Sequence, residues 1–418
     1  MFITETVVIG AGHAGLAVSR LLADSGRDHV VLDRGQVAER WRSERWDSLH
    51  LLTPNWMTRL PGWHYRGYDS EGYMSVSDFV DYLEGYADSF SAPVRTGTTV
   101  LEVTATDRGY RVVTDQGTWR TKNVVVATGP WGKPRVPGCL DLTGSDLRLT
   151  TASAYRNPQS LPDGGVLVIG ASSSGVQIAD ELSRAGRDVV LAVGRHTRMP
   201  RRYRGMDIFW WLERTGRLAR TIDEVRDPVA ARQEPSIQLV GRNEPDRFTE
   251  DLDLAALVAQ GVRVTGRLGS LTEGIATFQD NLQASVAESD HRMHRFLDKV
   301  DAHVDASGLG SEVWAAVRPR PFVAGAAPSS LDLRAEGVGT VLLATGYAPS
   351  HPWLQVPVTG RDGSIIQDRG ITAAPGLYVV GQRFQHRRDS GFIDGARHDA
   401  AAVVEHIAST RVLDPALR

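Results

Sequence analysis

The chain has 418 residues, which exceeds the size at which a single hydrophobic core usually stops growing, so we expect two packed domains. Charged residues make up 23% of the sequence and apolar residues 41%, an ordinary balance that excludes a disordered or fibrous class. The net charge of −3 argues against a nucleic-acid partner, and the single cysteine, Cys139, excludes the paired-thiol centre of a disulfide reductase.

The sequence predicts neither a membrane span nor an export signal. No apolar stretch approaches the roughly 20 residues that cross a bilayer, and the chain passes from Met1 into an apolar strand near Thr6 without a signal peptide. We therefore expect a cytoplasmic protein with no membrane partner and no metal, acting on small molecules. A homodimer stays open, because nothing in the sequence decides the oligomeric state.

The first predicted unit is a strand, a glycine turn, a helix and a second strand. An apolar strand at residues 7–9 leads into Gly10, Gly12 and Gly15, and the second strand ends at Asp33, close to the roughly 20-residue spacing of a dinucleotide-binding unit. The glycines permit a tight turn and close approach of a diphosphate to the helix N-terminus. Asp33 can accept hydrogen bonds from ribose hydroxyls and would repel a 2′-phosphate, so FAD or NAD fits here.

Two later strands end in the same tripeptide, Ala-Thr-Gly. Residues 124–126 lead to Thr128 and Gly129, and residues 341–343 lead to Thr345 and Gly346. Glycine at a strand end permits close approach of a backbone or ligand. The repeat beside each dinucleotide unit predicts that the chain crosses between domains near residues 150 and 338.

The second predicted unit repeats the pattern of residues 7–15 at residues 167–175. Its turn contains Gly170, Ser172, Ser173, Ser174 and Gly175, with Ser172 replacing the middle glycine. The position that matches Asp33 is Val193, and cations follow at Arg195 and Arg198. Arginine suits a phosphate, so this exchange favours NADPH at the second unit. The alternative is a solvated basic loop, since Arg201, Arg202 and Arg204 come soon after.

A Rossmann unit does not explain residues 199–238. This segment carries Phe209, Trp210 and Trp211 in a helix-like stretch that we consider as a cap over a substrate pocket, although adjacent aromatic residues point to different helix faces. Near the C-terminus, a strand at residues 376–381 precedes a helix at residues 393–407. If that helix begins near Ser390, its N-terminus could face a flavin, but a plain packing helix is the equal alternative.

The combined order of these features resembles the NADPH-dependent, single-component flavin monooxygenases, and within them the bacterial CzcO-like branch that is similar to plant YUCCA proteins. The resemblance covers nearly the whole chain. It is carried by both glycine turns, both Ala-Thr-Gly strands, Gly381 with the helix that follows, and the segment from Trp41 to Leu49.

The resemblance implies FAD and NADPH as cofactors, hydride transfer to the flavin, and addition of molecular oxygen at flavin C4a to give a peroxyflavin or hydroperoxyflavin. It implies N- or S-oxidation of a small organic substrate in preference to Baeyer–Villiger chemistry, whose longer fingerprint is not visible. Asn55 is the candidate catalytic residue, because an asparagine after the tryptophan segment lies beside the flavin in animal members; an ordinary turn residue is the alternative. The remaining cofactor candidates are Arg34, Trp41, Trp46, Gly381 and Gln382.

One position departs from the family pattern. The family has a histidine just before the second glycine turn, where this chain has Thr151. The family links that histidine to coupled NADPH oxidation, so two rival functions stay open: an NADPH oxidase, or a flavin reductase that passes electrons to a partner. A dinucleotide-binding regulator without catalysis is a third.

We therefore predict an α/β chain with two Rossmann-like dinucleotide-binding domains, the NADPH domain being inserted in the FAD domain. The first part of the FAD domain is predicted at residues 1–149. The NADPH domain, with a helical insertion near 199–238, is predicted at residues 150–338, and the return segment of the FAD domain at residues 339–418.

Overall fold

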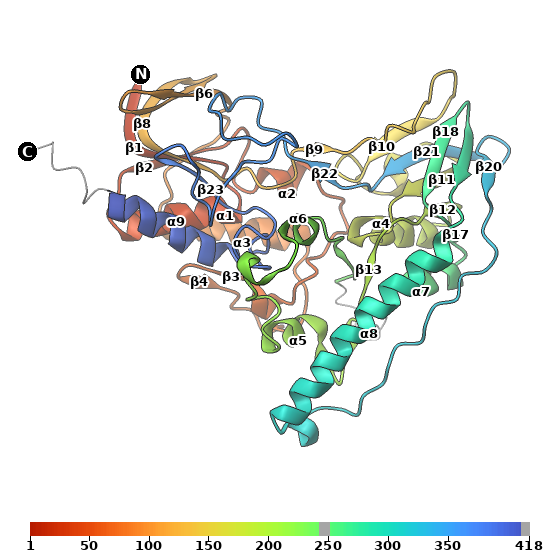
Figure 1. The fold of residues 1–418 in the computed structure, drawn as a ribbon. Helices are drawn as coiled ribbons and strands as arrows, with labels where there is room; N and C mark the ends of the chain where they lie inside the picture. The colour runs from red at the N-terminus through yellow and green to blue at the C-terminus, as the bar shows by residue number, and fades with distance from the viewer. Residues whose placement is uncertain (242–250, 411–418) are drawn as a thin grey trace, which may run out of the picture.

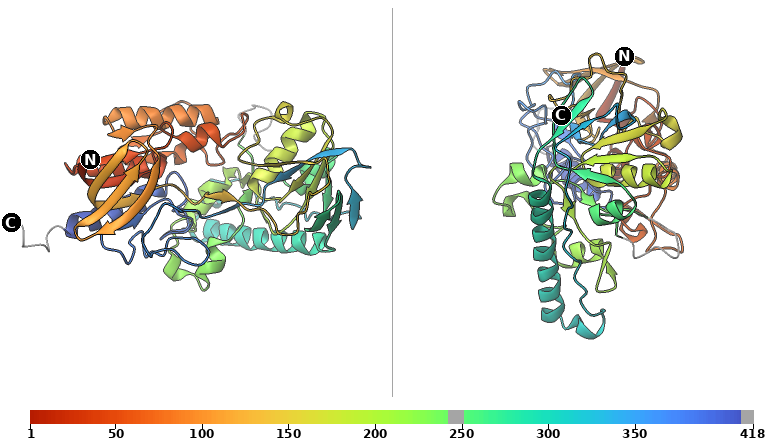
Figure 2. Two further views of the ribbon diagram at one scale, coloured as in Figure 1. Left: turned by 90° about the horizontal axis from the view of Figure 1, so that it is seen from above. Right: turned by 90° about the vertical axis from the view of Figure 1, so that its right-hand side faces the viewer.

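The computed structural model describes residues 1–241 and 251–410 and folds them around two parallel β-sheets (Figure 1). The two sheets lie at opposite ends of the molecule, and the long helix α8 begins beside the second sheet and extends away from it (Figures 1 and 2). This arrangement confirms the predicted α/β class with two dinucleotide-binding units. In the described part of the chain, no helix combines the length and hydropathy that a membrane span needs.

The first sheet has the strand order β5-β2-β1-β8-β7-β6, and β23 also pairs with β8. Strands β1, β2, β5, β8 and β23 run parallel, whereas β6, β7 and β8 form an antiparallel meander. The strands span β1 Phe2–Ile9, β2 His29–Leu32, β5 Val94–Arg95, β6 Val100–Thr106, β7 Gly109–Thr114, β8 Gly117–Val126 and β23 Leu377–Val379. Pairing of β23 with β8 returns the C-terminal part of the chain to the first sheet.

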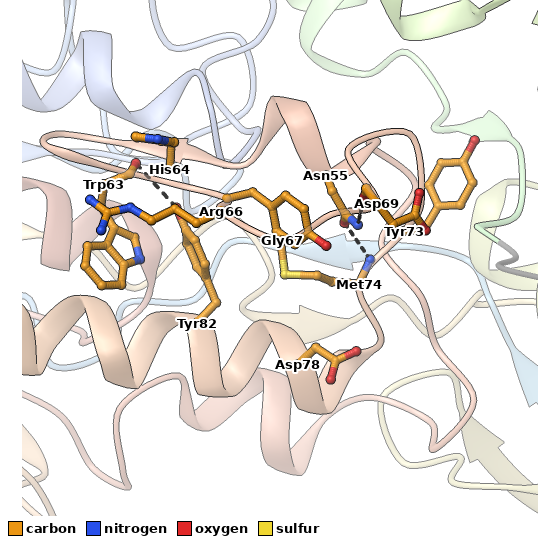
Figure 3. Close-up of a pocket in the computed structure, with 11 residues that line it drawn as sticks. Asn55, Trp63, His64, Arg66, Gly67, Asp69, Tyr73, Met74, Asp78 and Tyr82 are labelled. Carbon is orange, nitrogen blue, oxygen red and sulfur yellow. Dashed lines mark hydrogen bonds between the residues drawn. The ribbon is translucent and has the colours of Figure 1, made fainter.

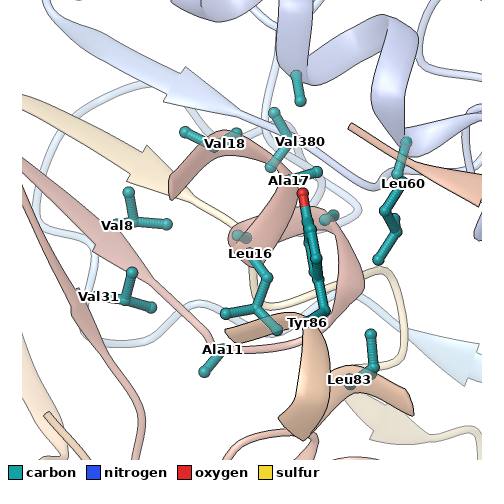
Figure 4. Packing of buried hydrophobic residues seen from close by; sticks show 14 of the residues in the cluster. Val8, Ala11, Leu16, Ala17, Val18, Val31, Leu60, Leu83, Tyr86 and Val380 are labelled. Carbon is teal, nitrogen blue, oxygen red and sulfur yellow. The ribbon is translucent and has the colours of Figure 1, made fainter. Parts of the chain in front are cut away.

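Three helices cover one face of the first sheet: α1 (His13–Asp24), α3 (Val76–Ser89) and α9 (Ala396–Thr410). Strand residues such as Val8 and Val31 are fully buried against Leu16 of α1 and Tyr86 of α3 (Figure 4). Each fully buried side chain of this size contributes about 1.5–3 kcal/mol of transfer free energy. The sheet and its helices therefore form one core that fixes the first glycine turn.

The second sheet is wholly parallel, with the order β10-β21-β11-β12-β17. Its strands and principal helices span β10 Arg148–Thr151, β11 Gly165–Ile169, α4 Ser173–Arg184, β12 Val189–Ala192, α7 Leu254–Ala259, β17 Arg263–Thr265, α8 Leu282–Ala306 and β21 Val338–Leu343. Strands β18 (Leu268–Thr272), β19 (Ile275–Phe278) and β20 (Ser330–Asp332) form a small antiparallel sheet that packs on one face.

The chain crosses between the two sheets beside both Ala-Thr-Gly segments. After them, β9 (Lys133–Pro134) pairs antiparallel with β22 (Tyr347–Ala348). The second sheet includes all of β10 and β21, so its strands run from Arg148 to Leu343. The domain limits stay a prediction, and residues 411–418 of the predicted return segment lie outside the described residues.

The insertion (residues 199–238) is only partly helical. It contains β14 Arg202–Tyr203, β15 Met206–Asp207, α5 Ile208–Arg214, the 3-10 turn η3 Ile222–Glu224 and α6 Pro228–Arg232, and β13 (Thr197–Arg198) pairs with β16 (Ile237–Gln238) at its base. Phe209 and Trp211 are buried in a core that includes α8, so they do not cap a pocket. The Trp211 indole donates to Tyr203 O at 2.7 Å.

Short elements between β2 and α3 build the loop that carries Asn55. They are α2 Glu39–Ser43, the 3-10 turn η1 Asn55–Met57, β3 Arg59–Leu60 and β4 Trp63–His64. At the other end of the chain, α9 begins at Ala396, later than predicted. The Ser390 hydroxyl accepts hydrogen bonds from the backbone of His386 and Arg387, so it stabilises the preceding turn instead of capping the helix.

Candidate functional site

The two glycine turns, residues 10–15 and 170–175, have the same packing. A Cβ on Gly10 would lie 2.7 Å from the carbonyl oxygen of Ala127, and a Cβ on Gly170 would lie 2.5 Å from that of Ala344. Both glycines also have positive φ, 112° and 108°. The Ala-Thr-Gly strands therefore lie directly against the turns, which explains why the tripeptide repeats with them.

The third glycine of each turn is equally confined, whereas the middle position faces open space. A Cβ on Gly15 or Gly175 would fall within 2 Å of the first glycine's carbonyl oxygen, at 1.9 and 1.8 Å. A Cβ on Gly12 would meet no atom within 4 Å. Internal packing does not require Gly12, so the absence of its side chain leaves room for a ligand at the N-terminus of α1.

Polar atoms beside both turns have no hydrogen-bond partner within the described chain. At the first turn these atoms are His13 Nε2 and Gln382 Nε2, and at the second turn Gln238 Oε1. Burial lowers the pKa of His13 to about 4, so its ring is neutral at pH 7. Gln238 also donates to Ala171 O at 2.7 Å, which fixes its amide beside the second turn. Unsatisfied buried polar atoms at a glycine turn fit a site for a polar ligand such as a dinucleotide.

Asp33 closes the first turn from the end of β2. Its carboxylate accepts hydrogen bonds from Ala11 N at 2.7 Å and Gly35 N at 3.0 Å. Burial raises the pKa of Asp33, although both backbone donors oppose that rise. At the matching place in the second unit, Val193 is fully buried and Arg195 is exposed beyond it. The two units thus differ in charge at the position that would face an adenosine ribose.

Asn55 is almost fully buried, with 4% of its surface exposed. Its Nδ2 donates to Asp69 O and its Oδ1 accepts from Met74 N, both at 2.8 Å. The amide therefore joins the two ends of residues 52–74, which we call the pocket loop. Each amide atom keeps one further hydrogen-bonding position.

The pocket loop and α3 line an open pocket of about 530 Å³ (Figure 3). Asn55, Asp69 and Tyr73 lie at one end, and Trp63, His64 and Arg66 lie at the other (Figure 3). Tyr65 and Tyr82 add aromatic surface to its walls. Four aromatic side chains in one pocket of this size suit a small organic molecule.

A buried ion pair in the insertion holds the pocket loop. Arg201 contacts Asp207, and their side chains are only 4% and 1% exposed. Arg201 Nη1 also donates to Leu52 O at 2.9 Å, and its guanidinium lies 4.5 Å from the ring centre of Tyr73. From the sequence, a solvated basic loop is the alternative interpretation of the arginine run that includes Arg201. That interpretation was wrong, because Asp207 lies close enough to neutralise the buried charge.

The Arg198 side chain is likewise buried and paired with acidic residues. It forms ion pairs with Asp253 at 2.8 Å and Asp290 at 2.7 Å, and it is 9% exposed. Two carboxylates already match its charge, so the structure does not favour the predicted contact with a 2′-phosphate. Arg195 remains the candidate for that contact.

Several predicted cofactor residues have other contacts. Trp46 is 5% exposed within the second core, and Trp41 packs edge-on against Phe79 with ring centres 4.8 Å apart. Arg34 is exposed and ion-paired with Glu44 at 2.6 Å. Thr345 Oγ1 donates to the carbonyl of Arg135. Thr128 and Gly129 lie beside the first turn after Ala127, and Gly381 approaches α1 so closely that a Cβ would lie 2.9 Å from Ala14 Cβ.

The sequence did not identify His13, Gln238, Tyr73 or Asp207 as site residues. His13 stands inside the first glycine pattern, which could have drawn attention to it; the others lie far from either pattern and meet the site only through the fold. Cys139 is a free thiol. Within residues 1–241 and 251–410, no group of acidic, histidine or cysteine side chains could hold a metal ion.

The chain is similar to known oxidoreductases in sequence and in fold. The family model described as "Pyridine nucleotide-disulphide oxidoreductase" matches residues 7–213. An uncharacterized CzcO-like oxidoreductase of Geobacillus kaustophilus is 30% identical over 97% of this chain and 98% of that protein. A probable indole-3-pyruvate monooxygenase, YUCCA1 of Arabidopsis thaliana, is 31% identical over about half of each chain, 49% and 50%. The structure of a flavin-containing monooxygenase from Stenotrophomonas maltophilia aligns with a TM-score of 0.66 at 19% identity, covering 98% and 99% of the chains.

Proposed function

Because the chain belongs to the CzcO-like oxidoreductases, a branch of the flavin monooxygenase family, we propose that it binds FAD at the first glycine turn and NADPH at the second, and oxidises a small organic molecule with molecular oxygen. N- or S-oxidation is the preferred chemistry in this proposal.

The observation that carries the assignment of the two cofactors is the difference between the units at one position. Both glycine turns have the same shape, but Asp33 stands at the end of β2 while Val193 and the exposed Arg195 stand after β12. A carboxylate accepts from ribose hydroxyls and repels a 2′-phosphate, whereas a guanidinium binds one. FAD therefore suits the first unit and NADPH the second.

Residues at the first unit fit FAD. Gly12 leaves space at the N-terminus of α1, where backbone N–H groups can bind a diphosphate without a cationic side chain. Asp33 would hold the ribose, and the unsatisfied amide of Gln382, next to Gly381, would face the ligand from the return segment. When bound, FAD supplies hydride acceptance from NADPH and electron transfer to oxygen.

Side chains of this chain would position the substrate and exclude water. The aromatic walls of the 530 Å³ pocket would displace water from those faces of an organic molecule that they contact. Asn55 is fixed by two 2.8 Å hydrogen bonds, so its remaining donor and acceptor positions keep constant directions. We propose that these positions orient the reacting groups, in line with the role suggested by the family resemblance.

An assay with a thioether, a tertiary amine and a cyclic ketone, each with NADPH and oxygen, tests the chemistry. We expect sulfoxide or N-oxide formation with one equivalent of NADPH consumed per product. Conversion of the ketone to an ester as the sole activity would reject N- or S-oxidation in favour of a Baeyer–Villiger monooxygenase.

One observation favours a second candidate, an NADPH oxidase or a flavin reductase that serves a partner. Thr151 stands where the family has a histidine, and its hydroxyl bonds within its own turn, at Ser153 Oγ (3.1 Å) and Ala154 N (3.3 Å). No long side chain extends from this position toward the other sheet. Hydrogen peroxide formed in equal amount to NADPH consumed, with every substrate, would support this candidate. Negligible turnover despite tight binding of both cofactors would instead indicate a regulator.

A further inference from the structure

Four arginines from three parts of the chain lie near Glu234. Arg195 follows β12, Arg217 follows α5, and Arg383 and Arg388 belong to the return segment. The Arg388 guanidinium forms an ion pair with the Glu234 carboxylate, and the Arg383 guanidinium donates to the backbone carbonyl of Glu234. We call these five residues the arginine cluster.

Positive charge exceeds negative charge in the arginine cluster. Burial alone would raise the pKa of Glu234, but Arg388, Arg217 and Arg195 outweigh burial and hold this pKa below its ordinary value. Of these three, Arg388 forms an ion pair with the carboxylate. A single carboxylate balances one of the four arginines.

Arg217 is the least compensated member. Its side chain is half-buried, and no hydrogen bond or ion pair joins its guanidinium to another residue in the described part of the chain. Burial lowers the pKa of Arg217 to about 10, and repulsion from Arg388, Arg220 and Arg295 adds to this effect, while Glu234 opposes it. Arg217 stays charged at neutral pH. A partly desolvated cation without a partner is costly unless an anion binds it.

The backbone beneath the cluster is held in place. Arg388 N donates to Arg220 O at 2.9 Å, and Ile222 N donates to His386 O at 2.7 Å, so residues 218–222 pair with the return segment. Arg387 is not part of the cluster, because both its Nε and Nη2 bond to Asp389 at 3.0 Å. The arginines thus converge from a fixed frame.

An aromatic surface adjoins the cluster at the crossing between the two sheets. The Arg383 guanidinium lies 5.8 Å from the ring centre of Trp131, which packs edge-on against Tyr347 at 5.5 Å. Trp131 and Tyr347 each follow an Ala-Thr-Gly segment. An anion that also carries a planar ring could therefore contact cation and aromatic surface together.

We propose that the arginine cluster is an anion-binding site for a phosphate or carboxylate group, and that Glu234 occupies the place of this anion in the free protein. The anion comes either from NADPH or from an acidic organic substrate. The choice between these sources rests on the proposed function, whereas the site itself does not. Removing Glu234 should then strengthen anion binding, while removing Arg217 should weaken it.

Isothermal titration calorimetry of the purified full-length chain tests this proposal without turnover. The probes are 2′,5′-ADP, which carries the nucleotide phosphates, and phenylacetate, an aromatic carboxylate. The variants are Arg217→Gln and Glu234→Gln. Arg214→Gln is the matched control, because Arg214 is exposed at the end of the same helix and stacks on Trp210 at 5.3 Å.

We expect Arg217→Gln to weaken binding of one probe about tenfold, in line with loss of one charge-assisted contact, and Glu234→Gln to strengthen it several-fold. Arg214→Gln should change neither affinity more than twofold. An effect on 2′,5′-ADP identifies the nucleotide as the source, and an effect on phenylacetate identifies the substrate.

The proposal is overturned if both Arg217→Gln and Glu234→Gln weaken binding, as a structural role would require, or if neither probe responds.

Wild-type affinity for the responding probe should also fall as sodium chloride rises from about 50 to 300 mM, because salt screens charge attraction. An affinity independent of salt would contradict the proposal even if a variant failed to fold. A chain that binds these anions but transfers no oxygen would refute the proposed function alone.

Discussion

The Tyr73 hydroxyl donates a 2.9 Å hydrogen bond to Oδ2 of Asp207 and so connects the pocket loop to the insertion of the second unit. Asp207 Oδ1 accepts from Phe209 N at 2.8 Å, which fixes the start of α5. The same carboxylate thus serves as the partner of Arg201, the cap of α5 and the anchor of the pocket wall. The shape of the pocket depends on a contact between two dinucleotide units.

Tyr73→Phe should loosen the pocket wall without unfolding the protein. Loss of one hydrogen bond costs about 1 kcal/mol of unfolding free energy, and the Arg201–Asp207 pair remains. Hydrogen–deuterium exchange of residues 69–74 should become faster. Tyr110→Phe is the control, since its hydroxyl donates to Pro375 O far from the pocket. Equal exchange of residues 69–74 in both variants would argue against an anchoring role for Tyr73.

Asp207→Asn should destabilise the protein strongly. It removes the carboxylate that contacts the buried Arg201 guanidinium, which costs about 3–5 kcal/mol. Urea denaturation followed by circular dichroism measures the loss. Asp223→Asn is the control, because its ion pair with Arg369 is more than half exposed on both sides and should contribute below about 1 kcal/mol. Similar losses in the two variants would contradict the account of a buried pair.

Gly10→Ala should impair folding, whereas Gly12→Ala should impair FAD binding. The first places a Cβ 2.7 Å from a backbone oxygen at a φ of 112°, so we expect poor folding. The second meets no protein atom within 4 Å, so we expect a normal fold with FAD affinity reduced about tenfold or more. Thermal melting and FAD titration separate these effects. Full FAD affinity in Gly12→Ala would place the diphosphate elsewhere.

Arg195→Gln should reduce the preference for NADPH over NADH. The variant loses the exposed guanidinium that we assign to the 2′-phosphate, so the ratio of the two kcat/KM values for flavin reduction should fall roughly tenfold or more. Arg198→Gln should instead lower stability, because Asp253 and Asp290 would lose their shared partner. A change in nucleotide preference in Arg198→Gln alone would reverse this assignment.

Acid should destabilise the FAD-free protein through His13. Burial holds the pKa of His13 at about 4 in the folded state, against an ordinary value of 6.5, so the unfolded chain binds the proton first as pH falls. The contribution of neutral His13 is complete above pH 6.5 and is lost between pH 6.5 and 4, up to roughly 3 kcal/mol. His13→Gln should flatten this part of the stability profile measured by urea unfolding. An unchanged profile would mean that His13 is accessible to water.

Much of the fold followed from local patterns. The glycine turns, the Asp33 and Val193 difference and the two Ala-Thr-Gly strands all depend on residues close together in the chain, where backbone geometry restricts which side chains fit. The two alanines of the Ala-Thr-Gly segments follow the same rule, because Ala127 and Ala344 contact the glycine turns directly.

Long-range partners could not be predicted in the same way. The basic run from Arg198 to Arg204 reads as a solvated loop until the fold brings Asp253, Asp290 and Asp301 beside it. Likewise, Trp46 follows the family pattern for a cofactor contact, yet it packs into the second core. The carboxylates that pair with Arg198 and Arg204 lie about 50 to 100 positions away in the sequence.

The central claim is that this chain transfers oxygen through FAD reduced by NADPH. Stopped-flow absorbance of the FAD-loaded protein tests it most directly: NADPH or NADH first reduces the flavin without oxygen, and oxygenated buffer is then mixed in. The account predicts faster reduction by NADPH, followed by a transient spectrum distinct from oxidised and reduced flavin that outlasts reoxidation of free reduced flavin. Immediate reoxidation with one equivalent of hydrogen peroxide would contradict the account and establish an oxidase or reductase.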